Sequence, residues 1–485
     1  MKKYLKIFNK LFPYIICLVF FSAYSVLAIV RFNHYGAFGF DLGLEDQRLW
    51  QYSHFKAPLT TIHFYPFTSI LSDHVEFFYI PLSVFYWIWS SPKFLLLIQA
   101  LFVCFSGIAV FLLAKEKKLN IFISYALLFS YLTFYGVQNA LWFDVHSASF
   151  GAAFIAWLLY FLEKKKIKWA VAAFILAISA KENFALLTFF IFLVFFIRTK
   201  NKIYLYLLGA SLVYIFLVFG IYFPYFTENG YRFKNEGGLL SNAFNYSSFY
   251  DTEEKRSVLF YSFAWFGFIP ILNPIFLLPA LSDLWNYFVV ASGLKAAQGL
   301  FMHYRITLAP LMVWATIITI SRYKWLNKRY LGAYIILAAM FFQYTLHLPL
   351  SYLSKQWFWK EPQGAKNINE IIKYLPKKAS VVSQNNITPH ISQRENIFTF
   401  WPEKRTFKVN SPCGNTDCDW FRWAGNPEYL IVDTSAEWDV RHLLTNREDY
   451  IKGLQNLEKK NVIVKYKESG NAVLYKIIKN PASSL

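Results

Sequence analysis

Residues 11–30 read LFPYIICLVFFSAYSVLAIV, twenty positions without a charged side chain. A run of about 20 apolar residues can cross the hydrocarbon core of a bilayer as a helix. The run is long for a signal-peptide core and lacks a small-residue cleavage site before residues 31–34, so we expect a retained span. In the whole chain 56% of the 485 residues are hydrophobic and 16% are charged, against about a quarter charged in an average protein. The sequence therefore predicts a polytopic α-helical membrane protein.

Ten further apolar runs follow, so we expect about eleven spans. Several are shorter than the roughly 20 residues that a perpendicular helix needs, which favours broken or tilted helices around a cavity. The runs cover residues 93–114, 121–137, 147–162, 168–180, 183–197, 203–223, 257–271, 274–290, 306–321 and 330–350.

Basic residues are concentrated in the N-terminal tail and in alternate connections, at 115–118, 163–168, 198–202 and 322–329. These five segments contain 18 Lys and Arg against two acidic residues, and so hold +16 of the formal net charge of +20. The positive-inside rule places them, and the N-terminus, in the cytoplasm. We attribute the basic charge to topology and contact with anionic membrane lipids, and we expect no nucleic-acid partner.

Residues 351–485 have a different composition, with Pro, Asn and mixed charge. We expect helices at 366–375 and 448–460, strands at 379–383 and 429–432, and a hairpin formed by 461–467 and 472–478. This pattern predicts a small C-terminal α/β domain beside a membrane domain of residues 1–350, whose first external loop is 31–92. Eleven spans from a cytoplasmic N-terminus make the C-terminal domain extracytoplasmic. Its Cys413 and Cys418 suit either a small-loop disulfide or two free thiols.

The first external loop opens with an acidic and aromatic segment, FDLGLEDQRLW, at residues 40–50. Its carboxylates, Asp41, Glu45 and Asp46, would be costly in hydrocarbon, so we expect them in a water-accessible cleft where the first span ends. In a helix, Asp41 and Glu45 share one face. The alternative is a solvated juxtamembrane helix with an acidic first turn.

Other polar residues fall on the same, non-cytoplasmic side of the expected topology. Each alone also suits a turn residue, a solvated ion pair or an interfacial anchor. Together they predict a cleft that combines carboxylates, imidazoles and cations, as a lipid-linked anionic substrate requires. They are His74, Asp144, His146, Lys181, Glu182, His303 and Arg305.

The order and spacing of these short motifs resemble an uncharacterised family of predicted polytopic membrane proteins, itself similar to the GT-C superfamily of integral membrane glycosyltransferases. The resemblance covers nearly the whole chain. It is carried by Phe40-Asp41-Leu42-Gly43, Asp46-Gln47, Trp50, His74, Gln99-Ala100-Leu101, Phe143-Asp144-Val145-His146, Lys181-Glu182, His303-Tyr304, Ser383-Gln384, Pro389-His390-Ile391-Ser392 and Arg394.

This resemblance implies a multi-span, GT-C-like fold whose first external loop carries the catalytic acid and whose donor is a polyprenyl-phosphate-linked sugar. In many GT-C enzymes the acid belongs to a tight acidic pair. Here Asp41 is followed by Leu-Gly, and Glu45 and Asp46 come after it. That departure leaves metal dependence open.

We therefore expect an integral protein of the bacterial inner (plasma) membrane that transfers a sugar from a polyprenyl-phosphate donor to an extracytoplasmic acceptor glycan, lipid or protein. Asp41 is the candidate general base. Glu45 and Asp46 are candidates to orient it or, with it, to hold a divalent cation, the one candidate cofactor. Asp144 completes the candidate catalytic set.

The candidate substrate-binding residues lie on the expected external turns. Arg305 and Lys181, with His303 and His146, suit the donor phosphate, since Arg offers bidentate contact. His74 suits orientation of the acceptor, of a metal or of neighbouring side chains, and Glu182 accompanies Lys181.

Two other classes remain open. One is a flippase or transporter of lipid-linked glycans, although the repeated halves typical of transporters are not visible. The other is a non-catalytic envelope assembly protein, which would tolerate loss of Asp41. The C-terminal domain either binds acceptor glycan or caps the cleft, through His390 and Arg394, or is purely structural.

Overall fold

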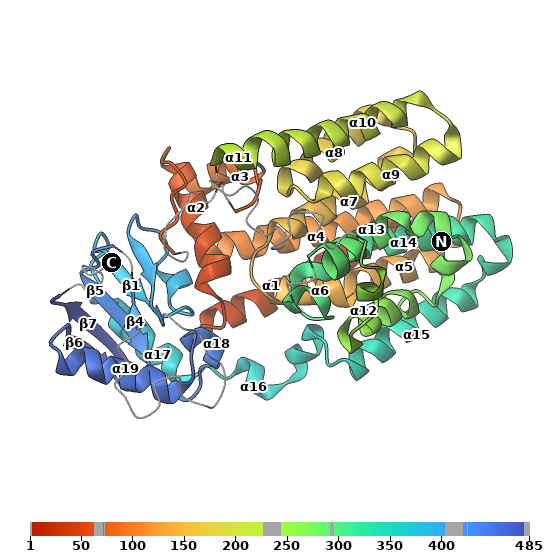
Figure 1. Ribbon diagram of the computed structural model, residues 1–485. Helices are drawn as coiled ribbons and strands as arrows, with labels where there is room; N and C mark the ends of the chain where they lie inside the picture. Colours follow the sequence, from red (N-terminus) through yellow and green to blue (C-terminus); the bar gives the residue numbers. More distant parts are fainter. Residues whose placement is uncertain are drawn as a thin grey trace. The chain divides into compact units, whose positions relative to one another are not determined.

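The computed structural model describes residues 2–62, 71, 73–226, 244–291, 295–402, 421–423 and 425–479. The chain divides into two compact units, each assembled from separated segments (Figure 1). The helical unit comprises Met1–Ala28, Leu71–Tyr79 and Leu96–Ser354. The α/β unit comprises Ile29–Ile70, Ile80–Leu95 and Lys355–Leu485. Cys413 and Cys418 lie outside the described residues.

Four helical segments among the described residues are long and apolar enough to cross a membrane. Two of them are single helices, Leu11–Asn33 of α1 (Lys2–Asn33) and α4 (Pro92–Glu116). The third, Lys202–Phe226, consists of α10 (Lys202–Leu217), the π-helical turn η4 (Val218–Tyr222) and α11 (Phe223–Phe226). The fourth, His303–Arg322, consists of the 3₁₀ turn η10 (His303–Arg305) and α14 (Leu308–Arg322). A fifth span results if α5 (Ile121–Thr133) and α6 (Tyr135–Trp142), which meet at a 41° bend, cross together.

The expected count of about eleven spans is therefore wrong. The remaining apolar runs form helices too short to cross a hydrocarbon core of about 30 Å, since a residue advances an α-helix by about 1.5 Å. They form α7 (Ser147–Glu163), α8 (Ile167–Ala180), α9 (Phe184–Thr199), α12 (Glu253–Ala264), α13 (Leu278–Trp285) and α15 (Arg329–Thr345). The run at 257–271 also departs from a span, because α12 begins with Glu253 and Glu254 and is followed by a 3₁₀ turn, Ile269–Leu272.

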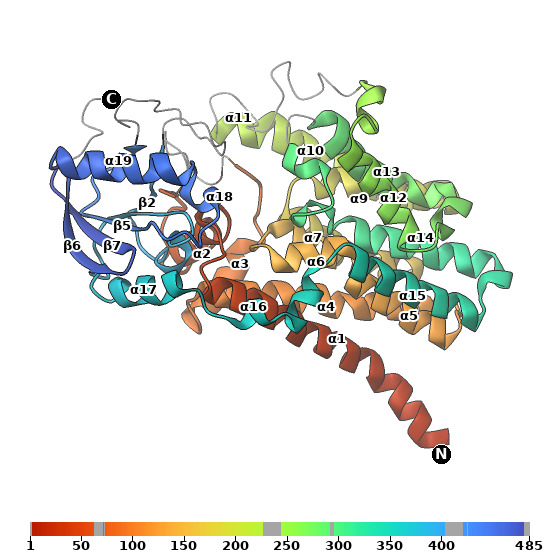
Figure 2. The same ribbon diagram turned by 90° about the horizontal axis from the view of Figure 1, so that it is seen from below.

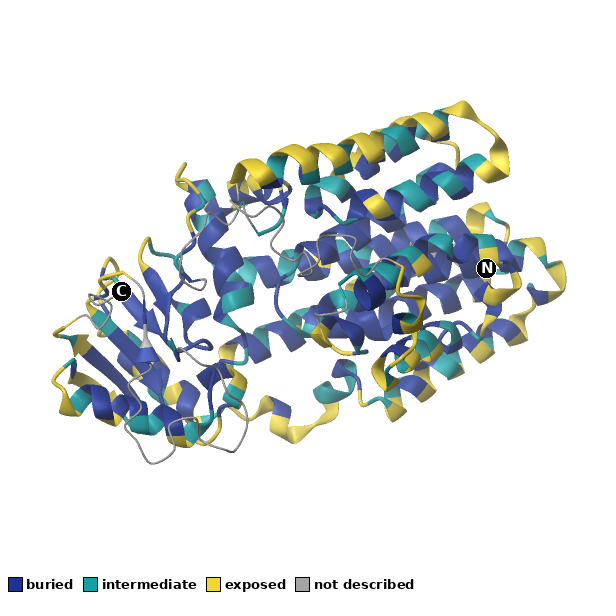
Figure 3. Cartoon of the chain, in the orientation of Figure 1, coloured by how far each residue is buried: buried dark blue, intermediate teal, exposed yellow. Residues whose placement is uncertain are grey.

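Burial separates the centre of the helical unit from its periphery. In the most apolar 18-residue window, 89% of the residues are buried in the His303–Arg322 segment but only 22% in Lys202–Phe226. Figure 3 shows the exposed side of this contrast, with α10 drawn mostly in yellow and teal. Beyond Lys202, the exposed side chains of α10 are mainly apolar, including Leu205, Val213 and Phe216. This face suits contact with lipid.

Four of the basic connections meet at one end of the helical unit around Glu163, the last residue of α7. The Lys117 ammonium group bonds its carboxylate, and Arg198 Nη1 and Trp314 Nε1 donate to its Oε1 at 2.6 and 3.1 Å. Asn327 Oδ1 accepts from the Asn120 N–H at 2.7 Å, which fastens the fourth connection to the first. Four of the five segments predicted to share one side of the membrane thus share one end of this unit.

The α/β unit contains a five-stranded sheet of order β2-β1-β5-β7-β6. Its strands are β1 (Val381–Ser383), β2 (Ile397–Thr399), β5 (Tyr429–Asp433), β6 (Ile463–Ser469) and β7 (Ala472–Ile477). β2, β1 and β5 are parallel, whereas β7 is antiparallel to β5 and β6. The expected hairpin is present, and its turn uses Gly470 at φ +53°, a conformation that glycine adopts without strain. A short pair, β3 (Trp401–Pro402) and β4 (Phe421–Arg422), lies apart from this sheet.

Two helices cover the two faces of the sheet, α17 (Gln363–Ile372) on one and α19 (Arg447–Lys459) on the other (Figure 2). Alternation along the strands explains the layering, because successive side chains of a strand point to opposite faces. Val382, Leu430 and Val432 pack in one core with the side chains of α19. Val381 and Ile431 pack in the other core with those of α17.

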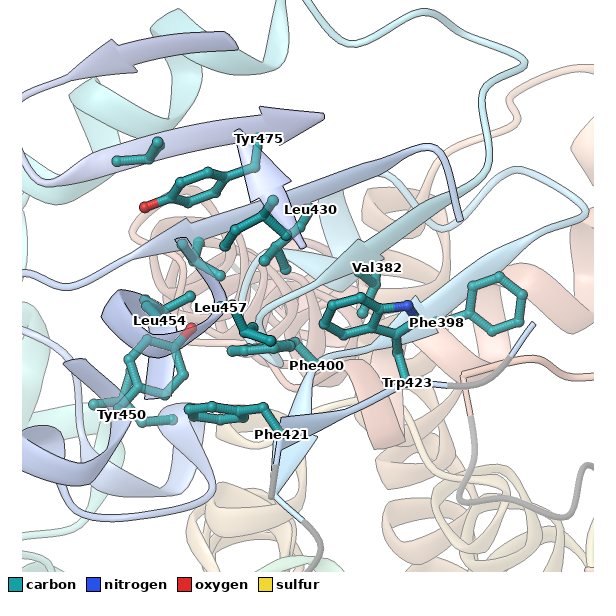
Figure 4. Packing of buried hydrophobic residues seen from close by; sticks show 14 residues of the cluster. Val382, Phe398, Phe400, Phe421, Trp423, Leu430, Tyr450, Leu454, Leu457 and Tyr475 are labelled. Carbon is teal, nitrogen blue, oxygen red and sulfur yellow. The ribbon is translucent and has the colours of Figure 1, made fainter. Parts of the chain in front are cut away.

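The core beneath α19 is rich in aromatic rings (Figure 4). Phe400 and Phe421 stack with ring centres 4.3 Å apart, and the Tyr450 ring meets both edge-on at 5.6 and 5.5 Å. Each fully buried ring of this size contributes roughly 1.5–3 kcal/mol through burial. This unit therefore has a hydrophobic core of its own.

Candidate functional site

The acidic segment of the first loop belongs to the α/β unit and forms two joined helical turns. A π-helical turn, η1 (Gly39–Gly43), carries Asp41, and α2 (Leu44–Ser53) carries Glu45 and Asp46. A π-turn is wider than an α-turn, so the expected common face of Asp41 and Glu45, which assumed α-helical spacing, does not follow from this backbone. Short π-helical insertions are frequent at functional sites.

The three carboxylates differ in burial. Asp41 is half-buried, Glu45 is 7% exposed and Asp46 is fully buried. Glu45 Oε2 lies 3.4 Å from Arg48 Nη1, one turn along α2. Asp41 is thus the carboxylate of this segment with the most access to solvent, as a proton-accepting role requires.

Asp46 is enclosed by neutral hydrogen-bond donors. Its Oδ1 accepts from Tyr86 Oη at 2.8 Å and from Gln393 Nε2 at 3.0 Å, and its Oδ2 accepts from Ser392 Oγ at 2.6 Å. Burial raises the pKa of Asp46 to about 6, although these three hydrogen bonds oppose the increase. Sequence reasoning missed Tyr86 and Gln393, because nothing in their local sequence marks them as partners of Asp46.

These contacts bear on the expected divalent cation. Both oxygens of Asp46 are engaged by protein donors, so this carboxylate does not suit a metal ligand. Among the described residues, no group of three or more His, Cys, Asp and Glu side chains is placed to hold a metal ion. Asp41, Glu45 and Asp46 therefore do not form such a group. Within the part of the chain that the structure describes, nothing supports a bound metal, and the divalent cation stays a prediction.

The side chains of His390 and Arg394, considered for acceptor binding, are both engaged within the α/β unit. The His390 ring lies between the rings of Phe32 and Tyr35, with centres 4.1 and 3.8 Å away. Burial lowers the pKa of His390 to about 3, so the ring is neutral at physiological pH. Arg394 donates through Nη1 to the Ala379 carbonyl at 2.8 Å and through Nε to that of Ile391 at 2.9 Å. These contacts favour the structural alternative.

The helical unit gathers a second set of polar groups, beginning with His74 and Glu182. His74 Nδ1 lies 2.8 Å from Glu182 Oε1, and the Val75 N–H donates to Glu182 Oε2 at 3.1 Å. Burial raises the pKa of Glu182, but the imidazole of His74 and the charge of Lys181 outweigh it and hold the pKa below its ordinary value. Glu182 therefore stays a carboxylate near neutral pH, although it is only 2% exposed.

Gln99 fixes the turn that carries Asp144 and His146. Its Nε2 donates to the Asp144 carbonyl at 3.1 Å, and its Oε1 accepts from the His146 N–H at 2.8 Å. Next to this turn, Ser147 donates its hydroxyl to the buried carboxylate of Glu76. Glu76 follows His74 by two residues, so this bond ties the His74 segment to the start of α7.

His146 and His303 stack face to face, with ring centres 3.4 Å apart. His303 is within electrostatic range of His74, Lys181 and Arg305 as well. Four chain segments, at 73–76, 143–147, 181–183 and 303–305, thus meet in one cluster of imidazoles, cations and carboxylates. We call it the imidazole cluster.

Arg305 is completely buried beside this cluster. Its guanidinium carbon lies 4.7 Å from the centre of the Tyr287 ring, and its Nη2 donates to the Ala297 carbonyl. Asn183 Nδ2 reaches Tyr287 Oη at 3.5 Å, so the turn carrying Lys181 and Glu182 meets the same tyrosine.

Asp283 interacts with the charge of Arg305 and accepts from Thr307 Oγ1 at 2.7 Å. Sequence reasoning missed Asp283, although a carboxylate inside the apolar run 274–290 is the kind of signal that marks such a partner.

The structure therefore divides the candidate residues between the units. Asp144 and the six substrate-binding candidates belong to the helical unit, whereas the other three catalytic candidates belong to the α/β unit. Within the helical unit the expected gathering of residues distant in sequence is observed. That all ten candidate residues line one cleft stays a prediction.

No curated protein matches the sequence. A family model described as a predicted membrane protein, DUF2079, matches residues 35–451, which include all ten candidate residues and most of both units. With apolar helices long enough to span a bilayer, the chain is a membrane protein and belongs to the DUF2079 family of predicted membrane proteins.

Proposed function

We propose that this protein is a membrane glycosyltransferase that moves a sugar from a polyprenyl-phosphate donor to an extracytoplasmic acceptor glycan, lipid or protein. The observation that carries the proposal is the imidazole cluster, where His74, His146, His303 and Lys181 meet beside the buried Arg305. Such a concentration of cationic and imidazole groups near a bilayer suits a phosphate attached to a lipid.

The reaction breaks the bond between the sugar C1 and a phosphate oxygen and forms a bond between C1 and the acceptor oxygen. The polyprenyl phosphate leaves with the electron pair of the broken bond, and Lys181 and Arg305 balance the charge that develops on it. The acceptor hydroxyl loses its proton to Asp41, the half-buried carboxylate of η1. Because the phosphate is a weak base, its departure needs no general acid.

Helix polarity supports an orientation for this chemistry. The His303–Arg322 segment, which is long enough to cross a membrane, has His303 of the imidazole cluster at one end and Arg322 at the other. The shorter helices α7 and α9 have the same polarity, with His146 and Glu182 before their first residues and Lys164 and Lys200 after their last. The positive-inside rule makes the basic end cytoplasmic and the cluster extracytoplasmic.

The division of the chain into units supports an extracytoplasmic α/β unit. Residues 34–70 and 80–91 follow the first span, whose N-terminal side is basic, and they form one compact unit with Lys355–Leu485. A compact unit lies on one side of a membrane, so the C-terminal residues share the extracytoplasmic side with the first loop. We propose the bacterial inner membrane as the location of the protein, as the resemblance to lipid-linked glycosyl transfer implies.

Transfer by purified protein tests the proposal. The full-length protein in detergent is incubated with undecaprenyl phosphate carrying a radiolabelled hexose and with a glycan and lipid extract from cells that lack the protein. We expect a labelled product, a loss of about 10² to 10⁴ in turnover for Asp41→Asn, and a comparable loss for Lys181→Ala. Transport requires two compartments whereas transfer does not, so absence of product across a panel of donor sugars, with folded protein, would favour a flippase or an assembly protein.

A further inference from the structure

The π-helical turn that carries Asp41 is held by the segment that follows β1 of the α/β unit. The Gly39 N–H, at the start of η1, donates to the main-chain oxygen of Asn385 at 2.7 Å and to its side-chain Oδ1 at 2.8 Å. Asn385 is separated from Gly39 by 346 residues of sequence. One residue therefore fixes the entrance of the turn, through both its main-chain carbonyl and its side-chain amide.

Close packing explains the glycines at both ends of this turn. A Cβ atom on Gly39 would lie 2.7 Å from Thr388 Cβ and 3.0 Å from the Asn385 oxygen, and one on Gly43 would lie 3.3 Å from Thr388 Cγ2. The first distances are shorter than van der Waals contact, so a side chain at Gly39 requires the backbone to move. The segment 385–389 thus lies too close to η1 for a side chain at Gly39.

A second attachment lies one turn further on, at Asp46. Ser392 and Gln393 donate to its two oxygens at 2.6 and 3.0 Å. Gln393 Oε1 also accepts from Ser90 Oγ at 2.9 Å, which includes residues 80–95 in the same network. Asn385 and Ser392 therefore bind the acidic segment on both sides of Asp41, and we call residues 384–393 the gripping segment.

The gripping segment is itself anchored in the sheet. Gln384 Oε1 accepts from the Asp433 N–H at 3.0 Å and from Tyr450 Oη at 2.7 Å, which fixes the end of β1 to β5 and α19. In open α/β sheets, ligands bind beyond the carboxyl ends of the parallel strands. At the carboxyl end of β1, the chain's own acidic turn occupies that position.

We infer that Asn385 and Ser392 are positioning residues for Asp41, and that the α/β unit serves as the rigid support of the acidic turn. The inference rests on the proposed role of Asp41 as the general base. A base must be placed within about 3 Å of the proton that it removes, and a displacement of 1 Å costs about 10²-fold in rate. π-helical turns are rare and occur mostly as single turns within α-helices, so we expect contacts from outside the turn to help hold this one.

The first test does not require knowledge of the reaction. In the full-length protein in nanodiscs, Asp41→Cys reports the surroundings of the turn through the rate at which a maleimide modifies its thiol, read against a variant without this cysteine. We expect Asn385→Ala and Ser392→Ala to change that rate severalfold. Ser469→Ala is the matched control, because Ser469 donates to Glu370 on an exposed part of the same unit. Unchanged rates in both variants of the gripping segment would overturn the inference.

The second test separates positioning from general stability. With Asp41 intact, Asn385→Ala and Ser392→Ala should lower kcat by about 10- to 100-fold with little change in KM, whereas Ser392→Thr and Asn385→Asp, which retain the oxygen atoms, should restore most of the turnover. Melting temperatures identify variants that merely unfold. Changed labelling with unchanged kcat would refute the positioning role, and full turnover by Asp41→Asn would refute the proposed base itself.

Discussion

His74 Nδ1 lies 2.8 Å from the Glu182 carboxylate, although 108 residues separate the two in sequence. Glu182 is almost completely buried, and its second oxygen accepts from the backbone N–H next to His74. The pair therefore fixes both the ring and the chain that carries it. It joins the segment after the first loop to the turn between α8 and α9.

Replacement of Glu182 by Gln should destabilise the helical unit by about 1–3 kcal/mol, since a buried charge-assisted hydrogen bond is lost while the shape is kept. The folded pKa of Glu182 is depressed, so its contribution is present above the unfolded value near 4.5 and is lost as the pH falls through the folded pKa. Melting of the detergent-solubilised protein at pH 7 and pH 4 measures both effects. An equal difference in melting temperature between wild type and variant at both pH values would contradict this account.

Asp46 should give the opposite pH dependence. Its folded pKa, about 6, exceeds the unfolded value near 3.8, so the folded state binds a proton that the unfolded state releases between these values. Stability from this group is full below pH 4 and declines until about pH 6, by about 3 kcal/mol in all. Asp46→Asn should remove this decrease of the unfolding free energy with pH. Glu448→Gln, at an exposed site, should leave the decrease unchanged. Chemical denaturation between pH 4 and 7 provides the measurement, and identical slopes for wild type and Asp46→Asn would disprove the prediction.

Gly136 in α6 should not tolerate alanine. A Cβ atom there would lie 2.3 Å from the carbonyl oxygen of Arg305, and backbone on both sides leaves no flexible group to move. We expect a loss of about 1–3 kcal/mol, as for overpacked sites. Gly209→Ala in α10 is the matched control, because nothing lies within 4 Å of its added Cβ, and alanine favours a helix. Similar melting temperatures for both variants would argue against the close approach of α6 to η10.

Labelling of single cysteines in cells tests the orientation. Lys165, at the basic end of the helical unit, and Lys467, on β6, are both exposed. A membrane-impermeant maleimide should modify Lys467→Cys in intact cells, but Lys165→Cys only after permeabilisation. The reverse pattern would invert the orientation, and modification of both in intact cells would exclude a division across the membrane.

The sequence predicted what depends on local patterns. The apolar run at 429–432 and the turn at Gly470 indicated strands that the sheet contains, and the charge of the connections predicted that residues such as Lys117 and Arg198 share one end. The span count failed because an apolar run shows hydrophobicity, whereas its helical length depends on bends and 3₁₀ turns set by tertiary packing. Periodicity alone does not locate a break such as that at Phe134.

The partners within the candidate site were harder to predict. The cluster residues were identified individually because charges in apolar surroundings are conspicuous. The pairing of His74 with Glu182, and of Asp46 with Tyr86, depends on contacts between distant segments. Local sequence does not specify these contacts, so the role of Asp46 as an enclosed carboxylate was not foreseen.

The discontinuity of the α/β unit has a consequence for biosynthesis. Gly39 and Asp46 leave the ribosome early, yet Asn385 and Ser392, which hold them, are made more than three hundred residues later. At a synthesis rate of about 5–20 residues per second, tens of seconds pass between synthesis of the acidic segment and synthesis of the residues that bind it. During that interval the helical unit is inserted while the nascent acidic turn lacks its partners. A chain that terminates before residue 385 can thus enter the membrane without ever completing the turn that bears Asp41.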